Sequence, residues 1–345
     1  MNWKHSVVAV IAALVLNGAM QAEVPADIAA KLVAIGRIVD PANTGKIYRP
    51  LHGSEPYKGV TVTRDVSFGP DPRNVLDVFV PEKGGKNRPV LIFVSGGAGN
   101  KRGPAPDQDF AADNMALWAL KNGMVGFNMQ RRPGTAWDDP AKDIGLIVEW
   151  VRTNAAKYKG NPKRMFLWAQ SAGTIPTATY LGHPELYGKD KDGKQSVGLK
   201  GVVLMSGPPF NILPLQAPPQ GPVFPPEAGG PGGAAPGLPK GDGQAKKGGE
   251  KKGGPPPVDP ATLLARSNLP GLLKGPVALN LISAELDPMG MAEFQVMLKD
   301  ELCKAGHCPV VSVLPKHSHM SEVYSVNTAD DSVAAPILKW MKSVK

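Results

Sequence analysis

The chain has 345 residues and an apolar content of 42%, so it can bury one large α/β core or the cores of two ordinary domains. Its 39 Lys and Arg residues outnumber its 30 Asp and Glu residues, and the net charge of +9 is compatible with anionic surfaces of the cell envelope. Because no nucleic-acid-binding motif accompanies this charge, we expect no nucleic acid among the partners.

Residues 1–22 have the three parts of a secretory signal peptide. A short basic start precedes an apolar run over residues 7–16, and small residues then lead to a predicted cleavage near Ala22. The run is shorter than the roughly 20 apolar residues of a membrane-spanning helix, although an uncleaved anchor stays open. We therefore expect an exported protein, periplasmic or secreted, whose mature form is soluble.

Residues 23–57 are predicted to form a helical extension ahead of the main domain. Apolar residues recur there at helical spacing until the sequence DPANTG, at residues 40–45, breaks the pattern. We therefore expect one helix that covers the body of the protein. The residues of its apolar face are Ile28, Leu32, Ile35 and Val39.

Residues 58–345 alternate between strand-like and helix-like segments. Short apolar runs bounded by Pro and Gly predict strands, the first of them antiparallel. Helical patterns at residues 109–122 and 143–158 separate later strands, which is typical of a mostly parallel sheet with helices on both faces. In the second of these patterns one face is apolar, and it consists of Ile144, Ile147, Val148 and Val151. The predicted strands cover residues 60–68, 74–81, 89–95, 123–129, 164–170, 201–207, 276–284 and 309–315.

The segment 208–257 does not follow this alternation, because 26 of its 50 residues are Pro or Gly. Such a composition cannot bury enough apolar surface to offset the entropy of ordering, so we expect a flexible insertion within the main domain. Its Lys-rich end suggests a mobile flap or a tether to the envelope, and a neutral low-complexity insertion is the alternative.

The two cysteines, Cys303 and Cys308, are close in the sequence. In an exported protein this spacing favours a short-loop disulfide, and two free thiols are the alternative. A zinc site is not expected, because only His307 could serve as a third nearby ligand.

Ser171 lies between a predicted strand and a predicted helix, in the segment AQSAG. A sharp turn from strand to helix exposes a serine oxygen at the edge of an α/β sheet, and small neighbours allow the backbone to turn. Ala169 stands where glycine is usual in this pattern. Taken alone, the motif is also compatible with an ordinary helix N-cap serine.

Downstream residues supply the partners that a serine nucleophile needs. A base must take the hydroxyl proton and a carboxylate must orient the base, in the chain order serine, acid, histidine. Asp287 follows a predicted strand, and the segment LPKHSHMSEV offers His317 and His319 after the last strand.

An oxyanion would need backbone N–H donors near the serine. The segment FVSGGAGN provides a Gly-Gly turn directly after a strand, so the amides of Gly97 and Ala98 are candidates, together with that of Ala172. All these candidates follow predicted strands, at the edge where open α/β sheets place their sites.

These stretches together resemble the α/β-hydrolase carboxylesterases of the hormone-sensitive-lipase and bacterial feruloyl-esterase-like type. The likeness runs from about residue 60 to the C-terminus, interrupted by the insertion, and it is most specific over residues 143–174. It implies an α/β-hydrolase fold with a mostly parallel sheet of about eight strands. It further implies an esterase with Ser171 as nucleophile, Asp287 as orienting acid and His319 as base, because the family's base precedes a final helix.

The resemblance implies a small-molecule ester of a small or medium acid as substrate, an acyl-enzyme intermediate and neither a metal nor an organic cofactor. The oxyanion loop departs from the family, since Ser95 replaces its histidine and Ala98 its third glycine. Two alternatives therefore stay open, a catalytically silent protein that binds an envelope partner and a serine peptidase on the same fold. The oligomeric state is open.

Other polar and aromatic residues are assigned simpler roles. Arg131 matches an arginine that follows the family's fourth strand, and we expect it to be structural. The acids Asp138, Asp139 and Asp143 are expected at the start of a helix rather than as ligands of a metal ion. We expect His183 and His307 at the surface or in loops. The tryptophans are expected in the core, and they are Trp118, Trp150 and Trp168.

Overall fold

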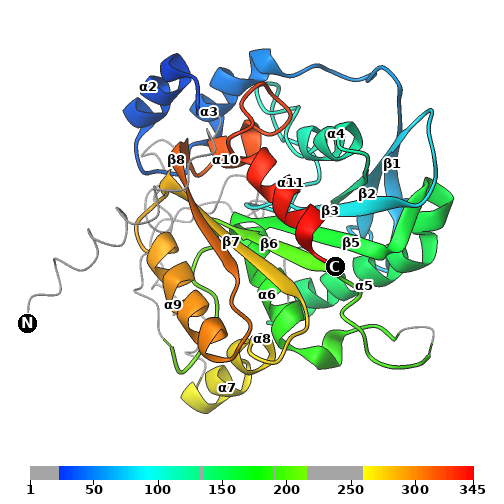
Figure 1. The fold of residues 1–345 in the computed structure, drawn as a ribbon, viewed down its shortest axis with the longest axis vertical. Coiled ribbons are helices and arrows are strands. Elements are labelled where there is room, and N and C mark those ends of the chain that lie inside the picture. The colour runs from blue at the N-terminus through cyan, green and yellow to red at the C-terminus, as the bar shows by residue number, and fades with distance from the viewer. Residues whose placement is uncertain (1–22, 133–135, 190–191, 216–258) are drawn as a thin grey trace, which may run out of the picture.

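The computed structural model describes residues 23–132, 136–189, 192–215 and 259–345, so the predicted signal peptide and most of the Pro/Gly-rich insertion lie outside the described residues. A single eight-stranded sheet, in the order β1-β2-β4-β3-β5-β6-β7-β8, forms the centre of the described chain (Figure 1). This sheet confirms the predicted architecture. Its strands are β1 (Val60–Ser67), β2 (Val75–Pro81), β3 (Arg88–Val94), β4 (Val125–Met129), β5 (Gly160–Gln170), β6 (Gly201–Met205), β7 (Ala278–Leu286) and β8 (Val310–Ser318).

The sheet is antiparallel at one edge and parallel elsewhere. β2 pairs antiparallel with both β1 and β4, and the remaining neighbours pair in parallel. β4 and β6 are buried at every residue, as expected for central strands covered on both faces. The parallel arrangement brings the carboxyl ends of β5, β6, β7 and β8 to one edge, in that order.

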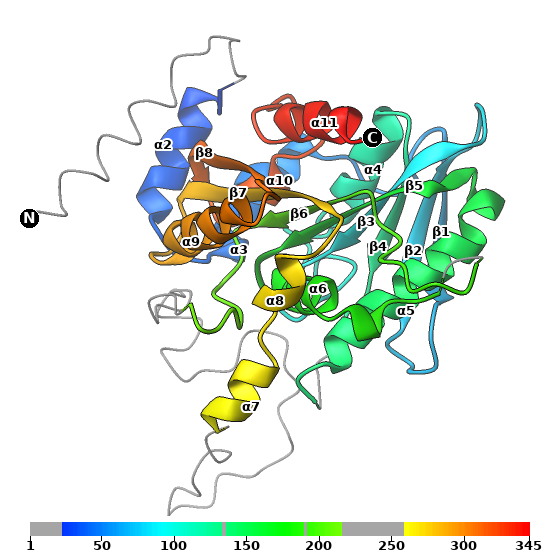
Figure 2. The same ribbon diagram turned by 60° about the horizontal axis from the view of Figure 1, so that its bottom comes forward.

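Helices cover both faces of the sheet, and Figure 2 shows the two layers. Each layer buries its apolar side chains in a separate cluster against the strands. The first layer comprises α2 (Ala26–Ile35), α3 (Pro41–Tyr48), α4 (Asp113–Lys121), α10 (Ser321–Tyr324) and α11 (Ala334–Ser343). The second comprises α5 (Asp139–Asn154), α6 (Thr174–Gly182), α8 (Leu269–Leu272) and α9 (Met291–Lys304).

The shorter helical segments are α7 (Pro260–Ala265) and the 3₁₀ turns η2 (Arg49–Leu51), η3 (Ala155–Tyr158), η4 (Ser171–Gly173) and η5 (Pro184–Leu186). Among the described residues, no helix combines the length and the apolar character needed to cross a membrane.

The tryptophans predicted to lie in the core are buried or half-buried. Trp118 on α4 and Trp168 on β5 pack edge to face with ring centroids 5.6 Å apart, and Trp150 on α5 packs against Phe127. These contacts confirm the predicted packing roles of the tryptophans. The predicted apolar face of α5 is also confirmed, since Ile144, Ile147, Val148 and Val151 are all buried.

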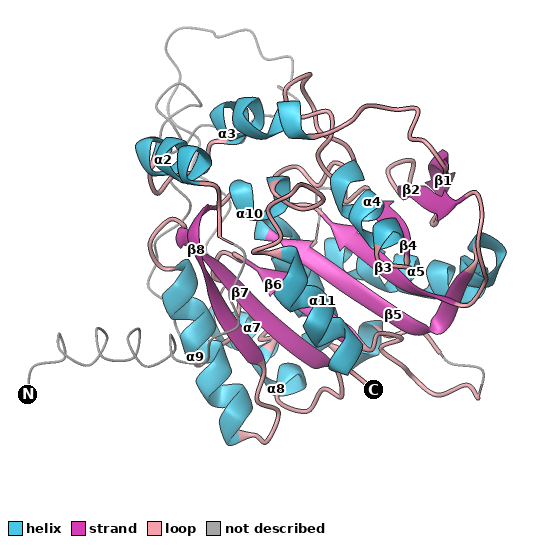
Figure 3. Cartoon of the chain, turned by 45° about the horizontal axis from the view of Figure 1, so that its top comes forward, coloured by secondary structure: helices cyan, strands magenta, loops and turns pink. Residues whose placement is uncertain are grey.

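The N-terminal extension forms two helices rather than the predicted single one. α2 ends at Ile35 because Gly36 takes a left-handed backbone with φ of 85°, so Val39 lies beyond the helix. Asp40 then caps α3, since its carboxylate accepts a hydrogen bond from the Asn43 N–H at 3.0 Å. Figure 3 shows α2 beside the end of β8.

The prediction for Asp143 is wrong. Asp143 is not a helix-start acid: it is buried in the second turn of α5 and pairs with the Arg132 guanidinium at 2.8 Å. An ion pair with a residue outside the helix thus satisfies this buried carboxylate. His183 lies in the loop between α6 and η5, as predicted, but its ring is buried against Trp137 and lies 2.9 Å from a Glu185 carboxylate oxygen.

The two cysteines are joined in the structure by a disulfide between Cys303, near the end of α9, and Cys308, before β8. Replacing both by serine is expected to lower the free energy of unfolding by about 2 kcal/mol, because the chain-entropy model assigns about that amount to so short a loop. Urea unfolding of the oxidised wild type and the double variant measures this difference. Equal stabilities would contradict it.

Candidate active site

Ser171 stands at a sharp turn between β5 and the helix that follows. β5 ends at Gln170, Ser171 takes a left-handed backbone with φ of 52°, and η4 leads directly into α6. Two glycines make this turn possible. A Cβ on Gly173 would lie 2.5 Å from the Val94 carbonyl oxygen, and a Cβ on Gly96 would lie 2.6 Å from the Ser171 Cβ. The loop after β3 therefore packs directly on the serine.

Ala169, which replaces the usual glycine of the motif, is an ordinary residue of β5. It pairs in register with Val94 and Leu204 and is buried. Because Ala169 belongs to the strand and not to the left-handed turn, a Cβ is tolerated there.

Ser171, His319 and Asp287 form one hydrogen-bonded chain. His319 Nε2 lies 2.8 Å from Ser171 Oγ, and His319 Nδ1 lies 2.8 Å from Asp287 Oδ1. Since an ionised carboxylate only accepts, Nδ1 carries the proton and Nε2 presents its lone pair to the serine hydroxyl. The three residues come from the carboxyl ends of β5, β8 and β7, and this is the geometry of a nucleophile, a base and an orienting acid.

His317, the other candidate base, faces away from Ser171. Its Nδ1 lies 3.0 Å from Ser321 Oγ and its Nε2 lies 2.8 Å from Ser332 Oγ, within a fully buried site. Burial lowers the pKa of His317 to about 4, so the ring is neutral at ordinary pH. The structure thus brings His319, and not His317, to the serine.

The candidate oxyanion donors lie on the loop after β3 and at the start of η4. Gly97 has a left-handed φ of 53°, and within the described chain neither its N–H nor that of Ala98 has an acceptor. Ala172 lies in the first turn of η4, where an N–H has no intrahelical partner and the helix dipole favours negative charge.

Arg131 holds this loop. Its Nη2 donates to the Gly97 carbonyl at 2.6 Å, and its backbone N–H donates to the Gly99 carbonyl at 2.8 Å. In a trans peptide the C=O of Gly97 and the N–H of Ala98 point in opposite directions, so the Arg131 contact fixes the direction of the Ala98 N–H. Burial lowers the pKa of Arg131, and the charge of Arg73 lowers it further, but the guanidinium stays charged.

Ser95, which replaces the family's histidine, and Gln130 form hydrogen bonds to the loop after β3. Ser95 Oγ donates to the Asn100 carbonyl at 2.6 Å, which closes the turn. Gln130 donates to the Asn100 side chain at 3.1 Å and accepts from the Lys101 N–H. Through these contacts with Asn100 and Lys101, Ser95 and Gln130 hold the loop in place.

Three buried polar residues behind the triad were not predicted from the sequence: Gln170, Ser206 and Glu322. Ser206 follows β6, and its Oγ lies 2.6 Å from Asp287 Oδ2 and 2.5 Å from Glu322 Oε2. Gln170 Nε2 donates to Glu322 Oε1 and to the His319 carbonyl, both at 3.1 Å. Gln170 and Ser206 could have been identified in the sequence by their positions at or just after the end of a strand. Glu322 could have been identified by its position three residues after His319.

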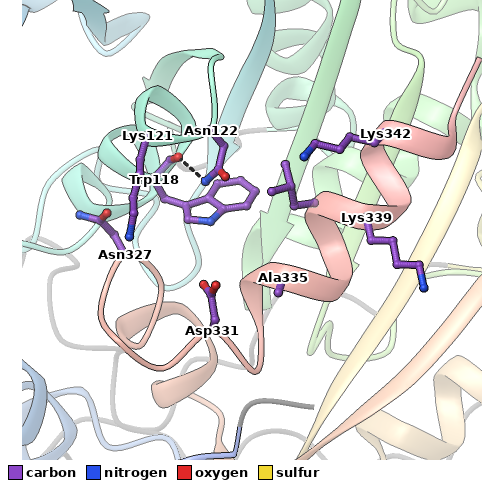
Figure 4. Close-up of a pocket in the computed structure, with 9 residues that line it drawn as sticks. Trp118, Lys121, Asn122, Asn327, Asp331, Ala335, Lys339 and Lys342 are labelled. Atoms are coloured by element: carbon purple, nitrogen blue, oxygen red, sulfur yellow. Dashed lines mark hydrogen bonds between the residues drawn. The ribbon is translucent and has the colours of Figure 1, made fainter. Parts of the chain in front are cut away.

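A surface pocket of about 270 Å³ between α4 and α11 contains no residue of the triad (Figure 4). Trp118 and Leu338 form part of its wall, and Lys121, Lys339 and Lys342 surround it. Among the described residues, no group of three or more His, Cys, Asp or Glu side chains is arranged to hold a metal ion.

Comparison with known proteins shows what the chain is similar to in family and in fold. A family model described as BD-FAE matches residues 76–203. A probable isoprenylcysteine alpha-carbonyl methylesterase of Oryza sativa subsp. japonica is 33% identical over 125 residues, which is 35% of this chain and 28% of the relative. Esterase LipQ of Mycobacterium tuberculosis is 33% identical over 116 residues, 32% of this chain and 27% of the relative. Each alignment thus spans less than a third of the relative's length.

Among solved structures, esterase B of Lactobacillus rhamnosis superposes with a TM-score of 0.58 at 13% identity, covering 92% of this chain and 96% of that one. The sequence matches confirm the predicted resemblance to the α/β-hydrolase carboxylesterases. The superposition confirms the predicted α/β-hydrolase fold.

In the His317→Gln variant, the free energy of unfolding is expected to fall less steeply than in the wild type as the pH is lowered from 6.5 to 4. The folded pKa of His317 is about 4, below its ordinary value of 6.5, so the unfolded chain binds one more proton between these pH values. The stability from this group is fully present above pH 6.5 and is lost as pH falls toward 4, with a slope of up to about 1.4 kcal/mol per pH unit.

Urea unfolding of wild type and His317→Gln at several pH values in this range measures both slopes. The variant should show the shallower one, whatever its absolute stability. Identical slopes would mean that the histidine is protonated in the folded protein.

Proposed function

We propose that this α/β-hydrolase chain is a serine carboxylesterase that hydrolyses esters of small or medium acids through an acyl-enzyme. The observation that carries the proposal is the continuous hydrogen-bonded chain from Ser171 through His319 to Asp287, with 2.8 Å at each step. Ester substrates are supported by the esterase names of the relatives.

In the first half-reaction, Ser171 Oγ attacks the ester carbonyl carbon while its proton passes to His319 Nε2. Asp287 accepts the Nδ1 proton in a hydrogen bond and stabilises the imidazolium that forms. The N–H groups of Gly97, Ala98 and Ala172 stabilise the oxyanion. The tetrahedral intermediate then collapses, the alcohol leaves with the proton from His319, and the acyl group stays on the serine.

In the second half-reaction, a water molecule attacks the acyl carbonyl and gives a proton to His319. Collapse of the second intermediate releases the acid and returns the proton to Ser171. The signal peptide predicted for residues 1–22 would place this activity in the periplasm or outside the cell, and this location stays a prediction.

Ser171→Ala is expected to lower the hydrolysis of short-chain p-nitrophenyl esters by about 10⁴-fold or more, because the nucleophile is removed. His319→Gln should cause a loss of similar size. Ser343→Ala is the matched control, since in the described part of the chain this hydroxyl donates to the Trp340 carbonyl, near the C-terminus.

Steady-state hydrolysis by the four purified, folded proteins makes this comparison. Equal rates in wild type and Ser171→Ala would contradict the proposal. A folded wild type without activity would favour the catalytically silent binding protein, and cleavage of peptides in preference to esters would favour the peptidase.

Arg131→Gln is expected to lower kcat by about 10-fold to 100-fold, since the Ala98 N–H loses the contact that orients it and one oxyanion donor is worth about 10²-fold to 10³-fold. KM should change little, because the effect arises in the transition state. Arg164→Gln, at an exposed position near the start of β5, serves as the control. A rise in KM at constant kcat would instead mean that Arg131 contacts the bound substrate.

A further inference from the structure

Two buried carboxyl groups share one serine hydroxyl behind the triad. Ser206 Oγ lies 2.6 Å from Asp287 Oδ2 and 2.5 Å from Glu322 Oε2. Ser206 and Glu322 are fully buried, and Asp287 is 2% exposed. Because bulk water does not reach these oxygens, the hydrogen atom in each of the two short contacts must belong to Ser206, Asp287 or Glu322.

The two short contacts need two protons, and with both carboxyl groups ionised only the one proton of the Ser206 hydroxyl would be present. A serine hydroxyl has a single proton and can donate to only one of the two acids. If both acids were ionised, the other short contact would place two unprotonated oxygens together in a buried site. One of the two carboxyl groups therefore holds a proton and donates it to Ser206 Oγ.

The hydrogen bonds of Asp287 identify it as the ionised partner. Asp287 accepts from His319 Nδ1 at 2.8 Å, from the Ala284 N–H at 2.7 Å and from Ser206. Several donors around one carboxylate favour its charged form. Outside its contact with Ser206, the Glu322 carboxyl group has one hydrogen-bond partner among the described residues, the neutral Gln170 amide, from which it accepts. Burial and the charge of Asp287 both raise the pKa of Glu322 well above its ordinary range.

We propose that Glu322 is a positioning residue that stays protonated and donates through Ser206 to Asp287, which keeps that carboxylate ionised and aligned with His319. The relay runs from Glu322 Oε2–H to Ser206 Oγ and from the Ser206 O–H to Asp287 Oδ2. Gln170 fixes the other oxygen of the acid and also bonds the His319 carbonyl. The catalytic consequence of this relay rests on the proposed function, whereas the location of the proton does not.

Neutrality of Glu322 matters for the base. A second buried negative charge near His319 would favour the imidazolium and weaken the ring as a proton acceptor. A neutral acid supplies the hydrogen bond without that charge. The site therefore contains one anion, Asp287, at the position that contacts Nδ1.

Glu322→Gln tests where the proton is, because the amide is neutral, has the same shape and can both donate to Ser206 and accept from Gln170. The infrared difference spectrum of wild type minus variant at neutral pH should show the C=O band of a protonated carboxylic acid. Carboxylate bands in its place would overturn the proposal, and this readout does not depend on esterase activity.

The same variant tests the consequence for catalysis. We expect kcat/KM within about threefold of wild type and an unchanged midpoint of the acid limb of its pH profile, which reports the protonation of the base. If Glu322 were ionised in the wild type, its loss would move that midpoint to lower pH by about one unit or more. An inactive wild type with the acid band present would count against the proposed function and not against the location of the proton.

Ser206→Ala and Glu322→Leu interrupt the relay. Ser206→Ala removes a donor to Asp287, whereas Glu322→Leu removes the group that orients the Ser206 hydroxyl and accepts from Gln170. Either change should therefore lower kcat by about tenfold at nearly constant KM, because the Asp287 carboxylate and the His319 ring are held less firmly. Glu322→Gln should restore the rate relative to Glu322→Leu. If Glu322→Leu does not fold, Ser206→Ala still tests the positioning role and the infrared spectrum still tests the location of the proton. Full activity of Ser206→Ala would overturn the positioning role.

Discussion

The left-handed backbone at Ser171 is the constraint on which the candidate site depends. A non-glycine residue in this conformation costs on the order of 1–3 kcal/mol and persists only where its surroundings enforce it. Here the surroundings are the loop after β3, which approaches through Gly96, and the Val94 carbonyl, which approaches Gly173. The strained turn aims the Ser171 hydroxyl at His319 and lies beside the loop after β3, which carries two of the candidate oxyanion donors.

The rest of the site follows from the order of four neighbouring strands. β5, β6, β7 and β8 are consecutive in the sheet, and each contributes a polar side chain at its carboxyl end. These side chains form one network that continues to Glu322 on α10, and the N-terminal extension adds a hydrogen bond from Arg37 to the Asp287 carbonyl. The polar residues of the network are Gln170 and Ser171, Ser206, Asp287 and His319.

Sequence patterns predicted those features that depend on local hydrophobic periodicity and on the order of residues along the chain. The eight strands and the buried face of α5 follow from apolar runs and helical spacing. Sequence alone could not assign Asp143, because its contact with Arg132 is set by tertiary packing. Ser206 and Glu322 were missed for the same reason, since their role depends on hydrogen bonds across 81 and 116 positions of the chain.

Covalent labelling tests the central claim most directly. A fluorophosphonate reacts with a serine oxygen only where a base removes its proton and donors receive the developing charge. Mass spectrometry of the labelled, digested protein should place the adduct on the peptide that contains Ser171, and denaturation before labelling should abolish it. A folded protein that forms no adduct, or forms it equally on other serines, would contradict the account.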